Sequence, residues 1–285
     1  MRLPVPRPRT IRDFYAFEAH VKAARARRGL DMVPEWYEMP VFYFSNPNAI
    51  YGHEAEIPYP AATNALDFEL EVAVVLGRGG RDIPVDEADE YIAGFTIMND
   101  WSARDIQRRE MAVGLGPAKG KDFATSLGPW LVTPDELADR REPAPPRASP
   151  AGLPAAQGKG GGAPRGYHYW LEMVARIDGR EVSRGNLADL YWTFAEMIAY
   201  ASRNCDLHPN EVLGSGTVGT GCLLELGLPW LQPGQVVELE VERLGVLRNT
   251  IGRRKTNDEG REARRRPDPS FALRPPTKPA ERPMQ

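Results

Sequence analysis

Histidine and cysteine are scarce in this chain of 285 residues, which has four of the first and two of the second. The histidines stand far apart, and the cysteines, Cys205 and Cys222, form no CxxC pattern. Zinc sites in proteins usually combine clustered His and Cys, so that kind of site is not expected and any metal should be held by oxygen atoms. Two isolated thiols also favour a reduced, cytoplasmic protein.

Long apolar runs and a strong charge of one sign are also missing. The longest apolar runs have the length of a strand, whereas about 20 apolar residues are needed to cross a bilayer. Residues 1–8 lack the apolar core of a signal peptide. The formal net charge is −3, with both signs mixed through the body of the chain. We therefore expect neither a membrane span nor a nucleic-acid surface, in spite of the basic run that begins at Arg253.

Apolar spacing and composition predict an α+β fold that is rich in strands and has few helices. Apolar residues at helical spacing in residues 10–29 predict a helix within an N-terminal segment, residues 1–50. Residues 51–252 read as a strand-rich body, with a further helix at 187–203. Two further segments lack apolar periodicity, namely 139–166, expected to be a flexible insertion, and 253–285, expected to be a disordered tail.

The most informative stretch is the acidic strand expected at residues 66–75. Its apolar residues alternate with Asp67, Glu69 and Glu71, and a strand places residues two apart on one face, about 7 Å from each other. Like charges there repel, and strands are normally poor in acids. A hard divalent cation such as Mg²⁺ or Ca²⁺ would compensate the charge. A solvated strand face explains these ten residues equally well.

Several other polar residues stand where an ordinary structural role is available. Asp100 follows the strand expected at 93–98 and precedes a helix, where Asp commonly acts as an N-cap. In that helix Arg104 and Gln107 are three apart and share a face. Lys121 lies in a glycine-punctuated loop, which fits a solvated loop or one that binds an anion.

A glycine-rich motif, an acid in an apolar run and a histidine on the N-terminal helix each have more than one interpretation. Residues 214–219 match the GxGxxG expression, but a dinucleotide site needs a helix after the glycines and residues 222–226 predict a strand. Glu225 lies inside that apolar run, and an acid in a core strand requires a partner. His20 lies on or beside the apolar stripe of the expected N-terminal helix, where a packing role is the alternative to a catalytic one.

Taken together, these motifs resemble the fumarylacetoacetate hydrolase family. The resemblance runs in order from about residue 10 to residue 247. It is carried by DFY at 13–15 with His20, DFELE at 67–71, MNDWSARDIQ at 98–107, LGP at 115–117 with GKDFAT at 120–125, and SGT at 215–217. The N-terminal part is similar to the fumarylacetoacetase-like branch in particular.

The resemblance implies a role for each matching position. It implies a metal site for Mg²⁺ or Ca²⁺, with Mn²⁺ as an alternative, at Asp13, Glu69, Glu71 and Asp100. It implies catalytic roles for Lys121 and for His20 and Glu225, the last two as a pair. It implies substrate contacts from Tyr15, Tyr43, Arg104, Gln107, Thr125 and Thr217. Two positions depart from the family pattern, because Met111 stands in place of a tyrosine and Phe44 in place of a histidine.

The implied activity is metal-dependent hydrolysis of a C–C bond in a 1,3-diketo acid, either fumarylacetoacetate or a related acylpyruvate. Such an enzyme would serve the catabolism of aromatic compounds, including tyrosine degradation, and would form a homodimer with a mixed β-sandwich or β-roll fold. A 2-oxo acid decarboxylase, isomerase or tautomerase that uses the same metal-enolate site is the alternative within enzymes. A catalytically silent metal-binding scaffold is the alternative outside them.

Overall fold

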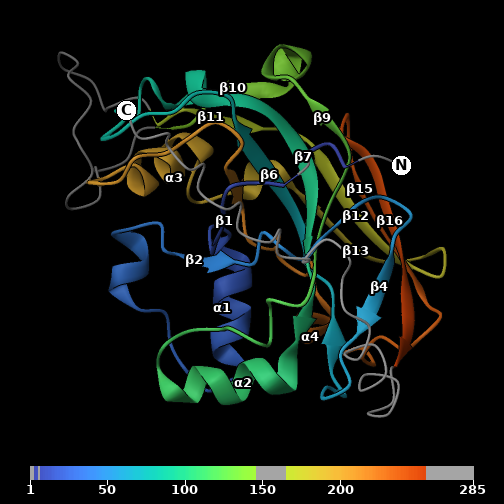
Figure 1. The fold of residues 1–285 in the computed structure, drawn as a ribbon. Helices are drawn as coiled ribbons and strands as arrows, with labels where there is room; N and C mark the ends of the chain where they lie inside the picture. The colour runs from blue at the N-terminus through green and yellow to red at the C-terminus, as the bar shows by residue number, and fades with distance from the viewer. Residues whose placement is uncertain (1–2, 6, 146–164, 255–285) are drawn as a thin grey trace, which may run out of the picture.

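Two sheets form the body of the protein, which the computed structural model describes at residues 3–5, 7–145 and 165–254 (Figure 1). The seven-stranded sheet has the order β2 (Phe42–Ser45), β1 (Ile11–Phe14), β14 (Val212–Gly214), β6 (Leu70–Leu76), β7 (Ile92–Asp100), β9 (Thr125–Val132) and β3 (Ile50–Tyr51). The five-stranded sheet has the order β13 (Arg180–Asn186), β12 (Glu172–Ile177), β15 (Val236–Val241), β16 (Gly245–Arg254) and β4 (Glu56–Tyr59).

Shorter elements connect and cover the sheets. Two small ladders pair β10 (Arg141–Pro143) with β11 (Tyr167–Tyr169) and β5 (Leu66–Asp67) with β8 (Ser102–Ala103). The α-helices are α1 (Glu18–Ala26), α2 (Arg104–Val113), α3 (Phe194–Ala201) and α4 (Leu223–Leu226). The 3₁₀ turns are η1 (Pro34–Tyr37), η2 (Ala88–Tyr91), η3 (Pro134–Arg140) and η4 (Leu187–Asp189). The predicted strand-rich α+β fold with few helices is therefore confirmed.

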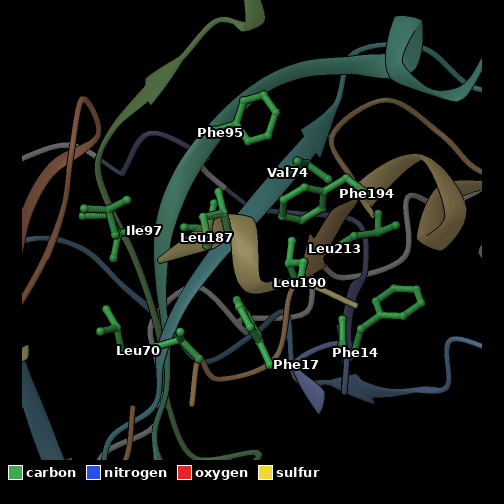
Figure 2. Close-up of a cluster of buried hydrophobic side chains, with 14 of the residues drawn as sticks. Phe14, Phe17, Leu70, Val74, Phe95, Ile97, Leu187, Leu190, Phe194 and Leu213 are labelled. Carbon is green, nitrogen blue, oxygen red and sulfur yellow. The ribbon is translucent and has the colours of Figure 1, made fainter. Parts of the chain in front are cut away.

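The main core lies where the two sheets meet, with β15 and β16 packed against β7 and β9. The same core continues on to the segment around α3, where Figure 2 shows Phe95 and Val74 of the seven-stranded sheet beside Phe194. The ring of Phe95, on β7, is fully buried and its centroid lies 4.8 Å from Tyr169 and 5.7 Å from Phe194. Burial of this apolar area is the main stabilising contribution that these strands share.

The N-terminal helix is shorter than predicted. Ile11–Phe14 form β1, which pairs in parallel with β14 and antiparallel with β2, and all four residues are buried. Helix α1 begins only at Glu18 and ends at Ala26. Apolar residues at helical spacing in 11–15 are thus explained by a strand buried on both faces, which a periodicity argument does not separate from a helix.

Two further predictions of secondary structure need correction, the first in part and the second entirely. The helix expected at 187–203 is a 3₁₀ turn followed by α3, which starts where Thr193 and Glu196 form a capping box. The strand expected at 222–226 is the short helix α4. Glu225 therefore lies in a helical turn, although four residues are still too few for the long helix of a dinucleotide-binding unit.

The domain boundaries remain predictions. Most of the expected insertion, 146–164, and most of the expected tail, 255–285, lie outside the described residues. The first part of the expected insertion is ordered, because β10 pairs with β11. Within the ranges that the structure describes, no helix is long and apolar enough to cross a membrane.

Truncation of the central aromatic cluster should destabilise the protein. We expect Phe95→Ala to lower the free energy of unfolding by about 3–5 kcal/mol, because it removes a buried ring and leaves a cavity. Val113→Ala, at a side chain that is 81% exposed, should change it by less than about 0.5 kcal/mol. Chemical denaturation of both variants measures the difference, and equal midpoints would contradict this account of the core.

Candidate active site

Four carboxylates gather at one end of the seven-stranded sheet, and we call Asp13, Glu69, Glu71 and Asp100 the acid cluster. Three of them lie in strands, whereas Glu69 directly precedes β6, because the strand expected at 66–75 is interrupted at residues 68–69. One oxygen of each carboxylate lies within 4.8 Å of an oxygen of every other, and all four residues are buried. β14 lies between β1 and β6, and β6 pairs with β7. The sheet order therefore brings together residues that are up to 87 positions apart in the sequence.

Glycine 214 makes this gathering possible. Gly214 is paired with Asp13 on one side and Ala73 on the other. A β-carbon at this position would lie 2.7 Å from Asp13 Oδ1 and 3.1 Å from Glu71 Oε2, and 2.3 Å from Met98 Cε. The bare backbone leaves room for the two acids, and any larger residue would push them apart.

Two buried cations contact one side of the acid cluster. Lys121 Nζ lies 2.7 Å from Glu69 Oε2 and 2.6 Å from Asp100 Oδ2. Arg104 donates from Nη2 to Glu69 Oε1 at 2.8 Å and from Nε to Asp67 Oδ2 at 2.7 Å. Asp100 also accepts a hydrogen bond from the hydroxyl of Tyr43, which lies 3.1 Å from Asp13 Oδ2. The positive charge is concentrated on Glu69, whereas Asp13 and Glu71 have no cation beside them among the contacts that the structure describes.

The ionisation of the cluster follows from this uneven compensation. Burial and the neighbouring carboxylates raise the pKa of Asp13 and of Glu71 well above the ordinary values. Burial also raises the pKa of Asp100, although Lys121 opposes it. Burial would do the same to Glu69, but Lys121 and Arg104 hold the pKa of that carboxyl far below its usual range. The cluster is thus short of positive charge at Asp13, Glu71 and Asp100.

A divalent cation fits this set of residues. Asp13 Oδ1, Glu71 Oε1 and Asp100 Oδ1 are buried and have no hydrogen-bond partner within the described part of the chain. Buried polar atoms are rarely left without a partner, and carboxylate oxygens are the ligands of Mg²⁺, Ca²⁺ and Mn²⁺. The four residues could hold one such ion.

His20 and Glu225, which we call the dyad, lie next to each other although they are 205 positions apart. Imidazole Nδ1 of His20, on α1, contacts Glu225 Oε1, on α4, and both side chains are almost fully buried. The second oxygen of Glu225 accepts a hydrogen bond from the Thr220 amide at 2.8 Å. The Tyr15 ring packs edge-on against the imidazole, with 5.2 Å between centroids, and burial raises the pKa of Tyr15 to about 12. The carboxylate therefore fixes the orientation of the ring.

The remaining predicted substrate residues, Gln107, Thr217 and Thr125, differ in their hydrogen-bond partners. Gln107 lies beside Arg104, whose Nη1 donates to Gln107 Oε1 at 3.1 Å, as expected for residues that share a helix face. The Thr217 hydroxyl lies 3.3 Å from the carbonyl oxygens of Leu70 and Gly221. The Thr125 hydroxyl lies 3.3 Å from that of Ser45, and Thr125 pairs with Asp100 in the sheet. Both threonines are buried.

A pocket of about 200 Å³ adjoins the acid cluster and provides room for a small molecule. It is lined by Tyr43, Phe44, Ser45, Asn46, Pro117, Ala118, Lys121 and Asp122. Phe44 is 60% exposed at its rim.

The N-cap role that was the alternative for Asp100 is not observed. Asp100 ends β7, and the N-cap residue of α2 is Ala103.

Two residues organise the site in roles that the sequence did not predict. Asp67 belongs to the acidic alternation but not to the acid cluster. Its carboxylate instead accepts hydrogen bonds from Arg104 and from the amides of Leu223 and Leu224. Glu110 accepts three amide hydrogen bonds from residues 118–120. The acidic alternation marked Asp67 in the sequence without indicating its partner, whereas nothing in the sequence marked Glu110.

Comparison with curated proteins finds fumarylacetoacetases. That of Arabidopsis thaliana is 36% identical over 248 residues, which are 75% of this chain and 57% of the relative. The chain therefore spans less than two thirds of the length of this relative.

Comparison with solved structures finds the same fold. The 5-carboxymethyl-2-hydroxymuconate delta-isomerase of Mycobacterium smegmatis matches with a TM-score of 0.64 and 26% identity, over 90% of this chain and 83% of the other. The fumarylpyruvate hydrolase of Pseudomonas aeruginosa, in complex with Mn²⁺ and pyruvate, matches with a TM-score of 0.63 and 24% identity, over 86% of this chain and 90% of the other.

A family profile described as Fumarylacetoacetate (FAA) hydrolase C-terminal matches residues 9–252, a range that contains every residue of the acid cluster and the dyad. The fold of the solved relatives and the identity to the fumarylacetoacetases agree with this match. The chain belongs to the fumarylacetoacetate hydrolase family.

Proposed function

We propose that this protein is a divalent-metal-dependent hydrolase that cleaves a C–C bond in a 1,3-diketo acid, with fumarylacetoacetate and related acylpyruvates as the substrate class. Two observations carry the proposal, namely an undercompensated acid cluster and a buried His–Glu dyad whose His20 is near enough to Glu69 to lower the pKa of that carboxyl. The names of the relatives, fumarylacetoacetase and fumarylpyruvate hydrolase, support the reaction class. The Mn²⁺ of the second supports a divalent ion.

Asp13, Glu69, Glu71 and Asp100 would hold the ion. When bound, it would supply a Lewis acid that polarises the oxygens of a 1,3-dicarbonyl and stabilises enolate charge. Tyr43 and Lys121, which contact Asp100 from two directions, keep that carboxylate in place. Isolation of the site from water strengthens each of these electrostatic contacts.

The dyad acts as the general base. With Nδ1–H donating to Glu225, the neutral imidazole has its free lone pair on Nε2, which can accept a proton from water. Glu225 stabilises the imidazolium that forms, and the Thr220 amide holds Glu225 in position. The hydroxide adds to one carbonyl carbon of the diketo acid, and the bond from that carbon to the neighbouring carbon breaks, which releases an acid and an enolate. The imidazolium then returns the proton to the enolate.

Lys121 and Arg104 stabilise negative charge that develops on the substrate. The Lys121 ammonium has three N–H groups and gives one each to Glu69 and Asp100, which leaves a third for a substrate oxygen in the pocket that it lines. Because the lysine is already oriented by two carboxylates, little reorganisation is needed during the reaction. Gln107, Tyr15, Thr125 and Thr217 are further substrate contacts in this proposal.

The alternative reaction class is decarboxylation or isomerisation of a 2-oxo acid. An enolate reaction of that kind needs the metal and the cations but no activated water, so a buried dyad favours hydrolysis. The homodimer that the family resemblance implies and the cytoplasmic location that the two isolated thiols favour are part of the proposal and stay predictions.

Removal of the imidazole should abolish hydrolysis and spare metal binding. We expect His20→Ala to lower kcat by about 10²–10⁴-fold, the usual contribution of a general base. Turnover is measured as loss of enol absorbance with two acid products, over a panel of fumarylacetoacetate and acylpyruvates with Mg²⁺ or Mn²⁺. His208→Ala, at an exposed histidine, is the matched control. Unchanged turnover in His20→Ala would exclude the assigned base, and release of CO₂ would favour the alternative reaction.

Neutralisation of one acid should remove the ion without harm to the ion-free fold. In wild-type protein, Mn²⁺ at 100 times its Kd should stabilise by about 2.7 kcal/mol and raise Tm. Glu71→Gln keeps the shape of the side chain, so we expect the Mn²⁺-dependent rise in Tm to disappear, while the ion-free Tm is no lower because repulsion with Asp13 is relieved.

Differential scanning calorimetry with and without Mn²⁺ measures both effects. Glu90→Gln, at an exposed glutamate paired with Arg78, is the control and should keep the full rise in Tm. An equal Mn²⁺ response in Glu71→Gln and wild type would show that the ion binds elsewhere.

A further inference from the structure

Cys222 is a buried thiol beside the dyad that the proposed mechanism does not use. Its side chain is fully buried, and Sγ lies 3.6 Å from Glu225 Oε1, the same oxygen that contacts His20 Nδ1. One ligand atom from each of His20, Cys222 and Glu225 lies within 4.8 Å of the others. Cys222 is the N-cap residue of α4, so the helix that carries Glu225 also fixes the position of the thiol.

This group differs chemically from the acid cluster. It offers one nitrogen, one sulfur and one oxygen, whereas the acid cluster offers oxygen only. Thiolate and imidazole ligands favour Zn²⁺, Cd²⁺ and similar ions, and hard ions such as Mg²⁺ prefer oxygen. We propose that His20, Cys222 and Glu225 form a second metal site, which binds a thiophilic divalent ion and shares no ligand with the acid cluster.

Binding at this site would disable the dyad. The thiol releases its proton to solvent on binding, because thiolate is the ligand form. The ion occupies His20 Nδ1 in place of the proton shared with Glu225, so the neutral ring carries its proton on Nε2. That nitrogen then has no lone pair for a proton from water. The inhibition rests on the proposed function, whereas the binding does not.

A cadmium titration tests the binding directly. Cd²⁺ added to the whole protein in excess Mg²⁺ should produce the ultraviolet absorbance of a cadmium–thiolate bond, saturating at one ion per chain. Cys222→Ser should lose this absorbance, and Cys205→Ser, at the exposed second cysteine, should keep it. His20→Ala should weaken the binding by on the order of 10–100-fold or more, since loss of an outer-sphere partner alone has that effect. Circular dichroism confirms that each variant is folded.

The site is refuted if wild type shows no saturable absorbance, or if the absorbance persists in Cys222→Ser and vanishes in Cys205→Ser.

A second experiment measures how Zn²⁺ inhibits turnover. Zn²⁺ should inhibit wild type at saturating Mg²⁺ and inhibit Cys222→Ser far less. Equal inhibition of both, relieved by more Mg²⁺, would place Zn²⁺ in the acid cluster and overturn the inhibitory role. If no hydrolysis is found on any substrate, the proposed function fails and the absorbance still decides the site.

An independent observation concerns Glu110, near the end of α2. Its carboxylate accepts hydrogen bonds from three successive amides, those of Ala118 at 2.9 Å, Lys119 at 2.6 Å and Gly120 at 3.1 Å. Successive amides that converge on one carboxylate hold a loop in a single conformation. The loop residue that follows is Lys121, whose ammonium contacts the acid cluster.

The same loop also packs closely against the start of α2 at Gly120. A β-carbon at Gly120 would lie 2.8 Å from the backbone nitrogen of Gln107, and the Gly120 carbonyl accepts a hydrogen bond from the Ala103 amide at 2.8 Å. Helix α2 begins with Arg104, the other cation of the site. From this geometry we infer that Glu110 is a positioning residue, which fixes Lys121 relative to Arg104 so that both reach Glu69.

Two substitutions of Glu110 test this inference. Glu110→Ala should lower kcat by on the order of 10²-fold, the cost of about 1 Å of misplacement at a reacting group, with a much smaller change in KM. Glu110→Gln retains one acceptor oxygen and should recover part of the loss. The exposed neighbour Arg109→Ala is the control. Amide hydrogen exchange of residues 118–120 should accelerate in Glu110→Ala and less in Glu110→Gln.

Unchanged exchange in Glu110→Ala, or accelerated exchange with unchanged kcat, would refute the positioning role. A parallel loss of kcat in both variants with no recovery by glutamine would refute it as well. Because hydrogen exchange needs no substrate, failure of the proposed function is recognised separately, as absence of turnover in the wild type.

Discussion

Repulsion among buried carboxylates is the constraint on which the rest of the site depends. Asp13, Glu69, Glu71 and Asp100 lie closer together than like charges tolerate in a medium of low dielectric constant. Among the residues that the structure describes, the two cations contact Glu69 and Asp100 and leave Asp13 and Glu71 without one. Such an arrangement is unfavourable for stability by itself, since buried charges without partners are costly. It persists because the surrounding strands fix the acids, and their free oxygens are suited to a cation.

The strands around the acids supply that rigidity. β6 is buried at all seven residues and pairs with β14 and β7, so Glu71 has no freedom to turn away. The Glu69 amide donates to the Asn99 side chain at 3.0 Å, which ties the residue before β6 to the end of β7. Packing between the sheets thus supplies the energy that holds the acids together, and a folded core is the condition for the chemistry.

Glu69 and Glu71 could be singled out from the sequence, because alternation along a strand is a local property, whereas the metal-site role of Asp13 and Asp100 came from the family resemblance. Glu69, Glu71 and Asp100 each stand in or beside a strand that its own neighbours predicted. The pairing of His20 with Glu225 came only from the family resemblance, since nothing local links residues 205 positions apart. The contact between Glu110 and the loop at 118–120 was not predictable, because it depends on how a helix and a loop dock.

The wrong assignment at 222–226 has a physical explanation that also connects the two halves of the site. Leu223, Leu224 and Leu226 favour burial in either a strand or a helix, so composition does not separate the two. Asp67 decides the outcome, because its carboxylate accepts hydrogen bonds from the amides of Leu223 and Leu224 at 2.8 and 3.1 Å. These are amides at the start of α4, which have no partner within the helix.

Asp67 joins the dyad to the acid cluster. It accepts a hydrogen bond from Arg104 Nε, while Nη2 of the same guanidinium donates to Glu69. A continuous series of charge-assisted contacts therefore runs from α4, which carries Glu225, through Asp67 and Arg104 to Glu69. The planar guanidinium fixes the geometry of both of its partners, which a lysine at this position could not do. One buried arginine thus connects the helix that carries Glu225 with the acid cluster, and the first amides of α4 complete that series.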